Sequence, residues 1–272
     1  MKTLLICHHG ATLDHEGMLR WLASFSEVVG VVVLRERPGR TRQRVRSQIK
    51  RAGLARFLDV LAFRLYYRLF LAARDRRWEE ERLGELRAEY PVLPDAPALE
   101  THSPNSPEAE EFLRRLAPDL VVARCKTLIK EEVFSVPRRG TFVMHPGVAP
   151  EYRNSHGCFW ALARRDLGRV GMTLLRIDRG VDTGPVYGYY SYPFDEVAES
   201  HVRIQHRVVF DNLPQLAARL QDICAGRATP LDARGRPSAA WGQPWLTSYL
   251  AWKRAARRDR AAGRRQETGA GA

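Results

Sequence analysis

A histidine and an aspartate follow two apolar runs in the middle of the chain. His145 ends the run 141–144 and begins a Pro/Gly-rich loop, and Asp182 lies in the polar turn 178–185, after the run 170–177. An imidazole and a carboxylate brought together can transfer protons near neutral pH. If both runs are strands of an open α/β sheet, we expect both loops at carboxyl strand ends, where such sheets bind ligands.

The sequence around these two residues resembles the catalytic half of the folate-dependent formyltransferases. That family includes enzymes that formylate glycinamide ribonucleotide, methionyl-tRNA and amino sugars. Its signature is Asn-x-His-Pro-Ser-Leu-Leu-Pro-x-Tyr-Arg-Gly, followed at a distance by Asp-x-Gly-x-Asp-Thr-Gly-Pro. The chain has VMHPGVAPEYRN at 143–154 and DRGVDTGP at 178–185. A weaker resemblance extends over about residues 1–210.

The resemblance implies N-formyl transfer from 10-formyltetrahydrofolate, as co-substrate, to an amine. The amine of a small molecule, amino sugar or peptide attacks the formyl carbon, and a proton passes from the amine to the folate nitrogen. By this resemblance His145 relays the proton and Asp182 orients the imidazole. The function implied is that of an enzyme of one-carbon metabolism.

The third catalytic position of the family, an asparagine, is Val143 in this chain. In the family that amide donates a hydrogen bond to the formyl oxygen, which valine cannot do. Residues i and i+2 of a strand share a face, so Val143 and His145 should point the same way. Loss of one such donor costs about 2.7–4 kcal/mol of transition-state stabilisation. The residues expected to line the altered site are Asn154, His156, Gly147 (serine in the family) and Arg153.

The folate co-substrate is expected beside the same loops. The segment 126–136 resembles the connection that precedes the catalytic strand of the family and helps to form its folate pocket. The cofactor-binding candidates are Lys126, Leu128, Thr183 and Gly184. No metal is expected: the four cysteines are far apart and indicate free thiols of a cytosolic protein, and His8, His9 and His15 are interpreted as polar residues at the sheet edge.

The surrounding pattern predicts an α/β fold of the Rossmann-like formyltransferase type, a mostly parallel sheet flanked by helices. Apolar runs at 3–7, 28–34 and 119–123 indicate buried strands. A further strand is predicted at 186–192 and one long helix over 202–225. In the family's glycinamide ribonucleotide enzymes a Gly-rich phosphate loop follows the first strand. The corresponding loop here has a single glycine, so the resemblance argues against glycinamide ribonucleotide as acceptor.

The resemblance, together with the composition along the chain, implies three regions. We predict a catalytic domain over 1–205 with a helical insertion at about 35–90, a helical extension over 206–258, and a basic disordered tail over 259–272. The tRNA enzymes of the family carry a C-terminal barrel domain. The short helical extension therefore argues against tRNA as acceptor.

The net charge of +13, mostly from arginine, favours an anionic partner such as nucleic acid, a nucleotide-sugar or an acidic membrane surface. The basic run 35–56 leads into an apolar stretch, 58–71, with arginines four apart. Three interpretations of this stretch are open: a helix that packs on the sheet, a homodimer face, or a helix that lies on a membrane interface. No run is long enough to cross a membrane, so a cytoplasmic protein is expected, with peripheral membrane contact as an alternative.

Two other functions compete with formyl transfer. A formyl-folate hydrolase would use the same pocket with water as acceptor. A non-catalytic protein on the same scaffold would bind RNA or membrane through its basic segments. His145 and Asp182 favour the two enzymes, whereas Val143 favours the non-catalytic alternative.

Overall fold

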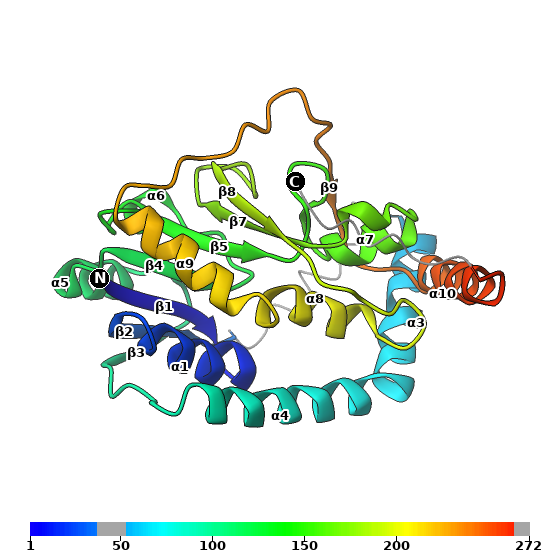
Figure 1. The fold of residues 1–272 in the computed structure, drawn as a ribbon, viewed down its shortest axis with the longest axis horizontal. Helices are drawn as coiled ribbons and strands as arrows, with labels where there is room; N and C mark the ends of the chain where they lie inside the picture. Colours follow the sequence, from blue (N-terminus) through cyan, green and yellow to red (C-terminus); the bar gives the residue numbers. More distant parts are fainter. Residues whose placement is uncertain (37–52, 264–272) are drawn as a thin grey trace.

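A seven-stranded sheet forms the centre of the computed structural model, which describes residues 1–36 and 53–263 (Figure 1). The strand order is β3-β2-β1-β4-β5-β7-β8. The first five strands in this order are parallel, and β7 is antiparallel to both β5 and β8. The strands are β1 (Lys2–His8), β2 (Glu27–Leu34), β3 (Ala98–Thr101), β4 (Leu120–Arg124), β5 (Thr141–His145), β7 (Met172–Arg176) and β8 (Val186–Tyr190). The predicted fold class is confirmed.

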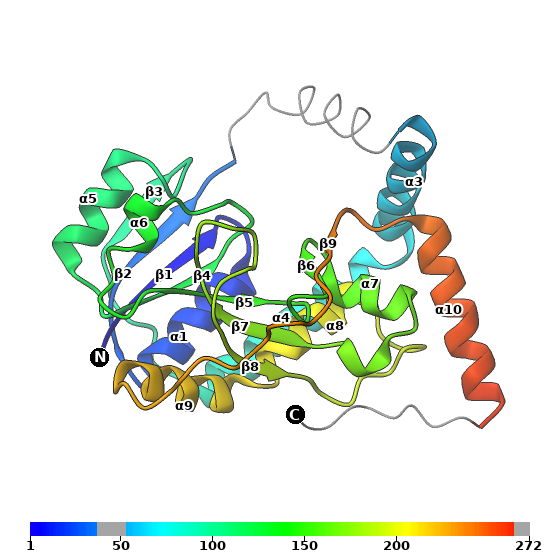
Figure 2. The same cartoon turned by 90° about the horizontal axis from the view of Figure 1, so that it is seen from above.

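Helices cover both faces of this sheet. On one face lie α1 (Met18–Ala23), α4 (Ala72–Glu89), α8 (His201–Phe210) and α9 (Leu213–Cys224), and on the other lie α5 (Pro107–Leu116) and α6 (Glu131–Phe134). At one end of the molecule α3 (Leu54–Phe70), α7 (Gly157–Ala163) and α10 (Leu246–Ala261) lie together (Figure 2). The remaining elements are η1 (Leu13–Gly17), η2 (Leu167–Arg169), and the small parallel pair β6 (Arg153–Asn154) and β9 (Ala240–Trp241).

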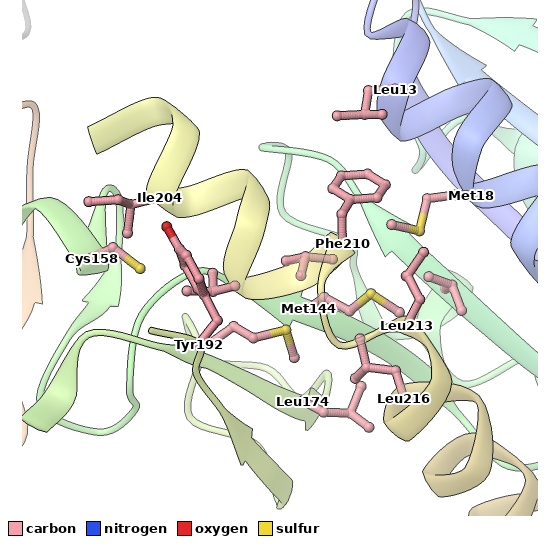
Figure 3. Packing of buried hydrophobic residues seen from close by; sticks show 14 of the residues in the cluster. Leu13, Met18, Met144, Cys158, Leu174, Tyr192, Ile204, Phe210, Leu213 and Leu216 are labelled. Atoms are coloured by element: carbon pink, nitrogen blue, oxygen red, sulfur yellow. The ribbon is translucent and has the colours of Figure 1, made fainter. Parts of the chain in front are cut away.

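The central strands are apolar throughout because both of their faces are buried. In β1, Leu5 and Cys7 belong to the larger core, beneath α1, α8 and α9, whereas Leu4 and Ile6 belong to the smaller core beneath α5. Figure 3 shows part of the larger core, where Met144 of β5 lies among Phe210, Leu213 and Leu216. The sheet is therefore a rigid platform for the loops at its ends.

The helix predicted over 202–225 is two helices, α8 and α9, so that prediction was wrong. The break falls at Asn212, whose side-chain amide donates to the carbonyl of Val208 at 2.9 Å. Pro214 occupies the first turn of α9. Proline has no N–H and clashes with the preceding turn, so it starts a helix readily but does not continue one.

The predicted regions map onto the structure as follows. The described part of the 35–90 insertion consists of α3 and α4, while 37–52 and 264–272 lie outside the described residues. The predicted boundary between 205 and 206 falls inside α8. Trp252 of α10 and Leu216 of α9 are buried in the same core as Leu5 of the sheet. Within the described residues no helix combines the length and hydropathy that a membrane crossing requires.

Candidate active site

The imidazole of His145 is buried at the end of β5 and contacted on both ring nitrogens. Nε2 lies 2.7 Å from the carbonyl oxygen of Tyr152, and Nδ1 lies 3.5 Å from Oδ2 of Asp182. Because a carbonyl can only accept, Nε2 carries a proton and donates it. The second proton that histidine can gain must then go onto Nδ1, facing the carboxylate. This arrangement suits a group that takes up and releases one proton.

The direction of His145 follows from strand alternation. Phe142 and Met144 point into the larger core, so Val143 and His145 share the opposite face of β5, as predicted. Val143 is only partly buried. The sheet thus places an apolar side chain at the position where the family has an amide.

Asp182 reaches His145 by a route that differs from the expected one. Because β7 is antiparallel to β5, the 177–185 loop starts at the opposite edge, where the N–H of Ile177 donates to Thr141 at 2.8 Å. To reach His145 the loop must therefore run back beside β5, over a rise of four strand residues, which is about 13 Å. Both loops do begin at the carboxyl ends of their strands, as expected, but because the two strands are antiparallel these ends lie at opposite ends of the sheet. The carboxylate is held by the N–H of Asn154, 2.7 Å from Oδ2.

Internal contacts fix the shape of the Asp182 loop. Oδ1 of Asp178 accepts hydrogen bonds from the N–H of Gly180 at 2.9 Å and the hydroxyl of Thr183 at 2.8 Å. A Cβ on Gly184 would lie 1.8 Å from the carbonyl oxygen of Arg176. Thr183 and Gly184 therefore have structural contacts of their own, and their role in binding folate remains a proposal.

Gly184→Ala is expected to destabilise the protein by about 1–3 kcal/mol, because the added methyl group must displace backbone rather than a movable side chain. Urea unfolding followed by circular dichroism measures the change. Gly168→Ala is the matched control, since nothing lies within 4 Å of a Cβ at that position. Equal unfolding midpoints for the two variants would contradict the tight packing at Gly184.

Gly147 lies in a space that admits no side chain. A Cβ there would be 2.4 Å from the carbonyl oxygen of Tyr152, 2.7 Å from Nε2 of His145 and 2.9 Å from Cα of Gly157. Gly157 is itself crowded, since its own Cβ would lie 2.5 Å from Cα of Gly147. The replacement of the family's serine by glycine is therefore required by this loop packing, and Gly147 can offer a ligand only its backbone.

Arg153 and Asn154 fasten the Asp182 loop to the segment around β9. Arg153 donates from Nη1 to the carbonyl of Val181 at 2.8 Å. The side-chain amide of Asn154 donates to the carbonyl of Trp241 at 2.6 Å. Both residues thus contact the Asp182 loop, and these contacts hold their donor groups in the protein. They are better placed to position Asp182 than to replace the missing amide.

His156 precedes α7 and faces α8. Its φ is +57°, and its ring centroid lies 6.1 Å from that of the buried His201. Within the described residues Nδ1 of each ring is buried without a hydrogen-bond partner. Burial, assisted by the positive charge of Lys126, lowers the pKa of His156 to about 4. At neutral pH His156 is therefore an uncharged ring that can donate one hydrogen bond.

This low pKa predicts a loss of stability in acid. A histidine with a depressed folded-state pKa stabilises the fold above its unfolded value of about 6.5, and this contribution is lost as the pH falls towards 4. His156→Asn, which stays neutral and tolerates positive φ, should reduce this loss by up to about 3 kcal/mol. Urea titrations of both proteins between these pH values test this. Burial raises the pKa of Glu79 to about 7, and its effect on stability has the opposite sign. Because Glu79 is present in both proteins, its effect cancels when their profiles are compared. Parallel stability profiles would contradict the prediction.

Other polar side chains meet at the carboxyl ends of β1 and β4, and the sequence did not single them out as a site. Arg124 pairs with Asp14 at 2.7 Å and donates to the carbonyl of Met144 at 2.9 Å. The ring of His8 accepts the backbone N–H of Lys126 at 3.0 Å. These contacts depend on β1 and β4 being neighbours, which the sequence does not state. Among the described residues no group of three potential metal ligands is assembled.

A cavity of about 360 Å³ adjoins the predicted folate segment. It lies between the chain around α6 and the start of the Asp182 loop, and it is lined by Glu131, Phe134, Ser135, Pro137, Arg138, Arg139, Gly140, Arg176, Ile177, Asp178, Arg179 and Pro185. The four predicted cofactor residues are not part of this lining. Lys126 and Leu128 are exposed, and Leu128 uses its carbonyl to accept from Asn105 at 2.8 Å.

Comparison with known proteins agrees with this geometry. The formyl transferase family model matches residues 77–219, more than half of the chain, and includes both His145 and Asp182. A methionyl-tRNA formyltransferase of Thermus thermophilus is 32% identical over 165 residues, 52% of this chain and 53% of that protein. A methionyl-tRNA formyltransferase of Halorhodospira halophila is 35% identical over 137 residues, which are 48% of this chain and 43% of that protein. The chain spans about half the length of the curated relatives it matches.

Solved structures support the fold. A phosphoribosylglycinamide formyltransferase from Anaplasma phagocytophilum superposes with a TM-score of 0.55 at 12% identity, covering 90% of this chain and 99% of that one. A sugar N-formyltransferase from a Shewanella species superposes with a TM-score of 0.54 at 13% identity, covering 94% of this chain and 87% of that one. At these identities the likeness concerns architecture. With the family match over 77–219, it shows that the chain belongs to the formyl transferase family.

Proposed function

We propose that the protein is an N-formyltransferase that moves a formyl group from 10-formyltetrahydrofolate to an amine of a small molecule, such as an amino sugar, or of a peptide. The observation that carries the proposal is the His145 ring, fixed between the Tyr152 carbonyl and the Asp182 carboxylate. The ring presents one exchangeable position, Nδ1, beside a negative charge. Such a pair can accept the proton that the attacking amine loses.

The proposed proton path uses these two side chains. As the amine bonds to the formyl carbon, its proton passes to Nδ1 of His145, and Asp182 stabilises the resulting imidazolium. The same proton then passes to the folate nitrogen as its bond to the formyl carbon breaks. No charge is left on the protein at the end, so the residues are ready for another turnover.

The cavity beside α6 fits the chemistry of the folate donor. Its lining combines the apolar Phe134 and Ile177 with four arginines, two of which, Arg138 and Arg179, also pair with Asp119 and Glu131. Apolar side chains suit an aromatic ring system, and guanidinium groups bind carboxylates in bidentate fashion. We infer that this lining holds the glutamate end of the folate. Lys126, Leu128, Thr183 and Gly184 remain proposed contacts nearer the reactive end.

We propose His156 as the donor that compensates for Val143. The amide of Asn154 already donates to Trp241, whereas His156 is neutral at pH 7 and its Nδ1 has no hydrogen-bond partner within the described residues. A neutral imidazole can stabilise a developing oxyanion. His156→Gly, which adopts the φ of +57° and has no side-chain donor, should lower kcat by about 10²-fold or more, and Asn154→Ala should have a smaller effect. Full activity in both variants would refute this role.

An assay with 10-formyltetrahydrofolate and a panel of amines tests the function itself. Product formation that depends on the amine is the expected result. Release of formate at the same rate with and without amines would identify a hydrolase instead. No turnover of the folate under any condition would favour the non-catalytic alternative.

The remaining partner proposals concern the surface. We propose a cytoplasmic protein, which accords with the four free thiols among its cysteines. The expected partners of the basic segments were nucleic acid, a second copy of the chain and a membrane surface. The helix that follows the basic run, α3, exposes leucines, and aliphatic side chains are poor contacts for phosphates. A bilayer or a second copy therefore fits this surface better than nucleic acid.

A further inference from the structure

The helix α3 has two apolar faces, and within the described residues only one of them is covered. Leu54, Leu58, Leu61, Leu65 and Leu69 are 40–65% exposed and recur at intervals of four, three, four and four residues. At 3.6 residues per turn they form one continuous stripe. We propose that this leucine stripe docks the protein on the surface of an anionic lipid bilayer. The inference is independent of the proposed formyl transfer.

The leucine stripe is not the face by which α3 packs against the core. The opposite side of α3 carries Phe57, Val60 and Phe63, all buried. The ring of Phe63 lies 5.8 Å from Phe159 of α7 and 5.2 Å from Tyr249 of α10. The helix is thus anchored by its inner face, and its orientation leaves the leucine stripe pointing outwards. A rigid helix loses little conformational entropy when it meets a further surface.

Exposed arginines lie on α3 itself and on the adjoining α10. Arg64 and Arg68 of α3 are exposed, as are Arg254, Arg257 and Arg258 of the adjoining α10. The acids of these helices are engaged elsewhere: Asp59 accepts hydrogen bonds from Thr247, and Asp259 pairs with Arg165 at 2.7 Å. An apolar stripe with a cationic rim is the pattern of helices that lie in the interface of anionic membranes.

The same charges argue against a second copy as the occupant. In an antiparallel two-fold pairing of α3 through the stripe, each side of the stripe meets the same side of the partner helix, so the row of Arg64 and Arg68 meets its own copy. Such like-charge contacts are unfavourable, and the acids of α3 and α10 are turned to other partners. An anionic bilayer has the complementary sign. Nearby, Arg56 lies 5.0 Å from the Trp245 ring, so a tryptophan adjoins the rim, a residue favoured at membrane interfaces.

The position of this surface is compatible with docking. Figure 1 shows α3 and α10 at the end of the molecule towards which the arrows of β1 and β5 point. Figure 2 shows α3 and α10 along the outer side of this end. A bilayer there would contact the two helices without touching α5, α6 or α9 at the other end.

Vesicle co-sedimentation of the whole protein tests the proposal. Phosphatidylcholine vesicles are compared with vesicles that also contain phosphatidylglycerol, for the wild type and for the triple variant Leu58→Ser, Leu61→Ser, Leu65→Ser. Because these side chains are exposed, the variant should fold, and circular dichroism confirms that. Val92→Ser with Leu93→Ser is the matched control, since these residues are 63% and 51% exposed outside α3.

The wild type and the control should bind the anionic vesicles, with the triple variant at least about 10-fold weaker. Absence of wild-type binding to anionic vesicles would overturn the proposal. So would equal binding by the triple variant, which would indicate charge attraction alone. Light scattering is run in parallel, and a wild-type dimer that the triple variant converts to monomer would assign the stripe to a second copy and overturn bilayer docking.

Discussion

Asp182→Asn is expected to lower kcat/KM for formyl transfer by about 10²–10⁴-fold while leaving the fold intact. The amide keeps an oxygen that can accept from the N–H of Asn154, and asparagine tolerates the backbone φ of +51° at this position. It removes only the negative charge that stabilises the imidazolium of His145. Steady-state kinetics with 10-formyltetrahydrofolate and the acceptor amine measure the effect.

Asp232→Asn is the matched control for this change. Asp232 is an exposed loop carboxylate that pairs with Arg234 at 2.8 Å, so its loss should leave kcat/KM unchanged. An Asp182→Asn protein as active as this control would show that the carboxylate beside His145 has no part in catalysis.

Gly147→Ser, which restores the residue of the family signature, is expected to reduce activity by about 10²-fold or more. The added Cβ would lie 2.4 Å from the Tyr152 carbonyl and 2.7 Å from Nε2 of His145. Relief of either contact pushes the carbonyl and the ring apart and releases the histidine. A displacement of about 1 Å in a catalytic group costs on the order of 10²-fold in rate.

A stability measurement accompanies the kinetics of Gly147→Ser. Overpacking of this loop should also destabilise the fold by about 1–3 kcal/mol. Gly168→Ser, at a glycine with no neighbour within 4 Å of its Cβ, should change neither quantity. If Gly147→Ser retains the activity and unfolding midpoint of Gly168→Ser, the crowding around the His145 ring is not as described.

The sequence was sufficient to predict the parts of the fold that depend on local pattern. Runs buried on both faces, such as 28–34, became central strands. The start of α5 likewise follows from local sequence, since Ser106 accepts the N–H of Ala109 at 3.3 Å and Pro107 occupies the first turn. The pairing of His145 with Asp182 could be predicted only through the family motifs, which imply a contact across 37 residues of chain that periodicity cannot supply.

The rest depends on packing that no local pattern records. His201 and His206 look like ordinary residues of an amphipathic helix, and only the docking of α8 beside α7 brings His201 to His156. The antiparallel direction of β7 is not encoded in its composition, so the path of the Asp182 loop could not be foreseen. The mutual contact of Gly147 and Gly157 likewise arises from a fold-back of the loop.

Calorimetric titration with a stable analogue of 10-formyltetrahydrofolate tests the central claim most directly. The proposed function predicts saturable binding to the wild type and to Asp232→Ala, and clearly weaker binding to Asp182→Ala, because the Asp182 loop borders the pocket. Absence of binding to the wild type would contradict the claim and would indicate that the site, altered at Val143, serves a different ligand.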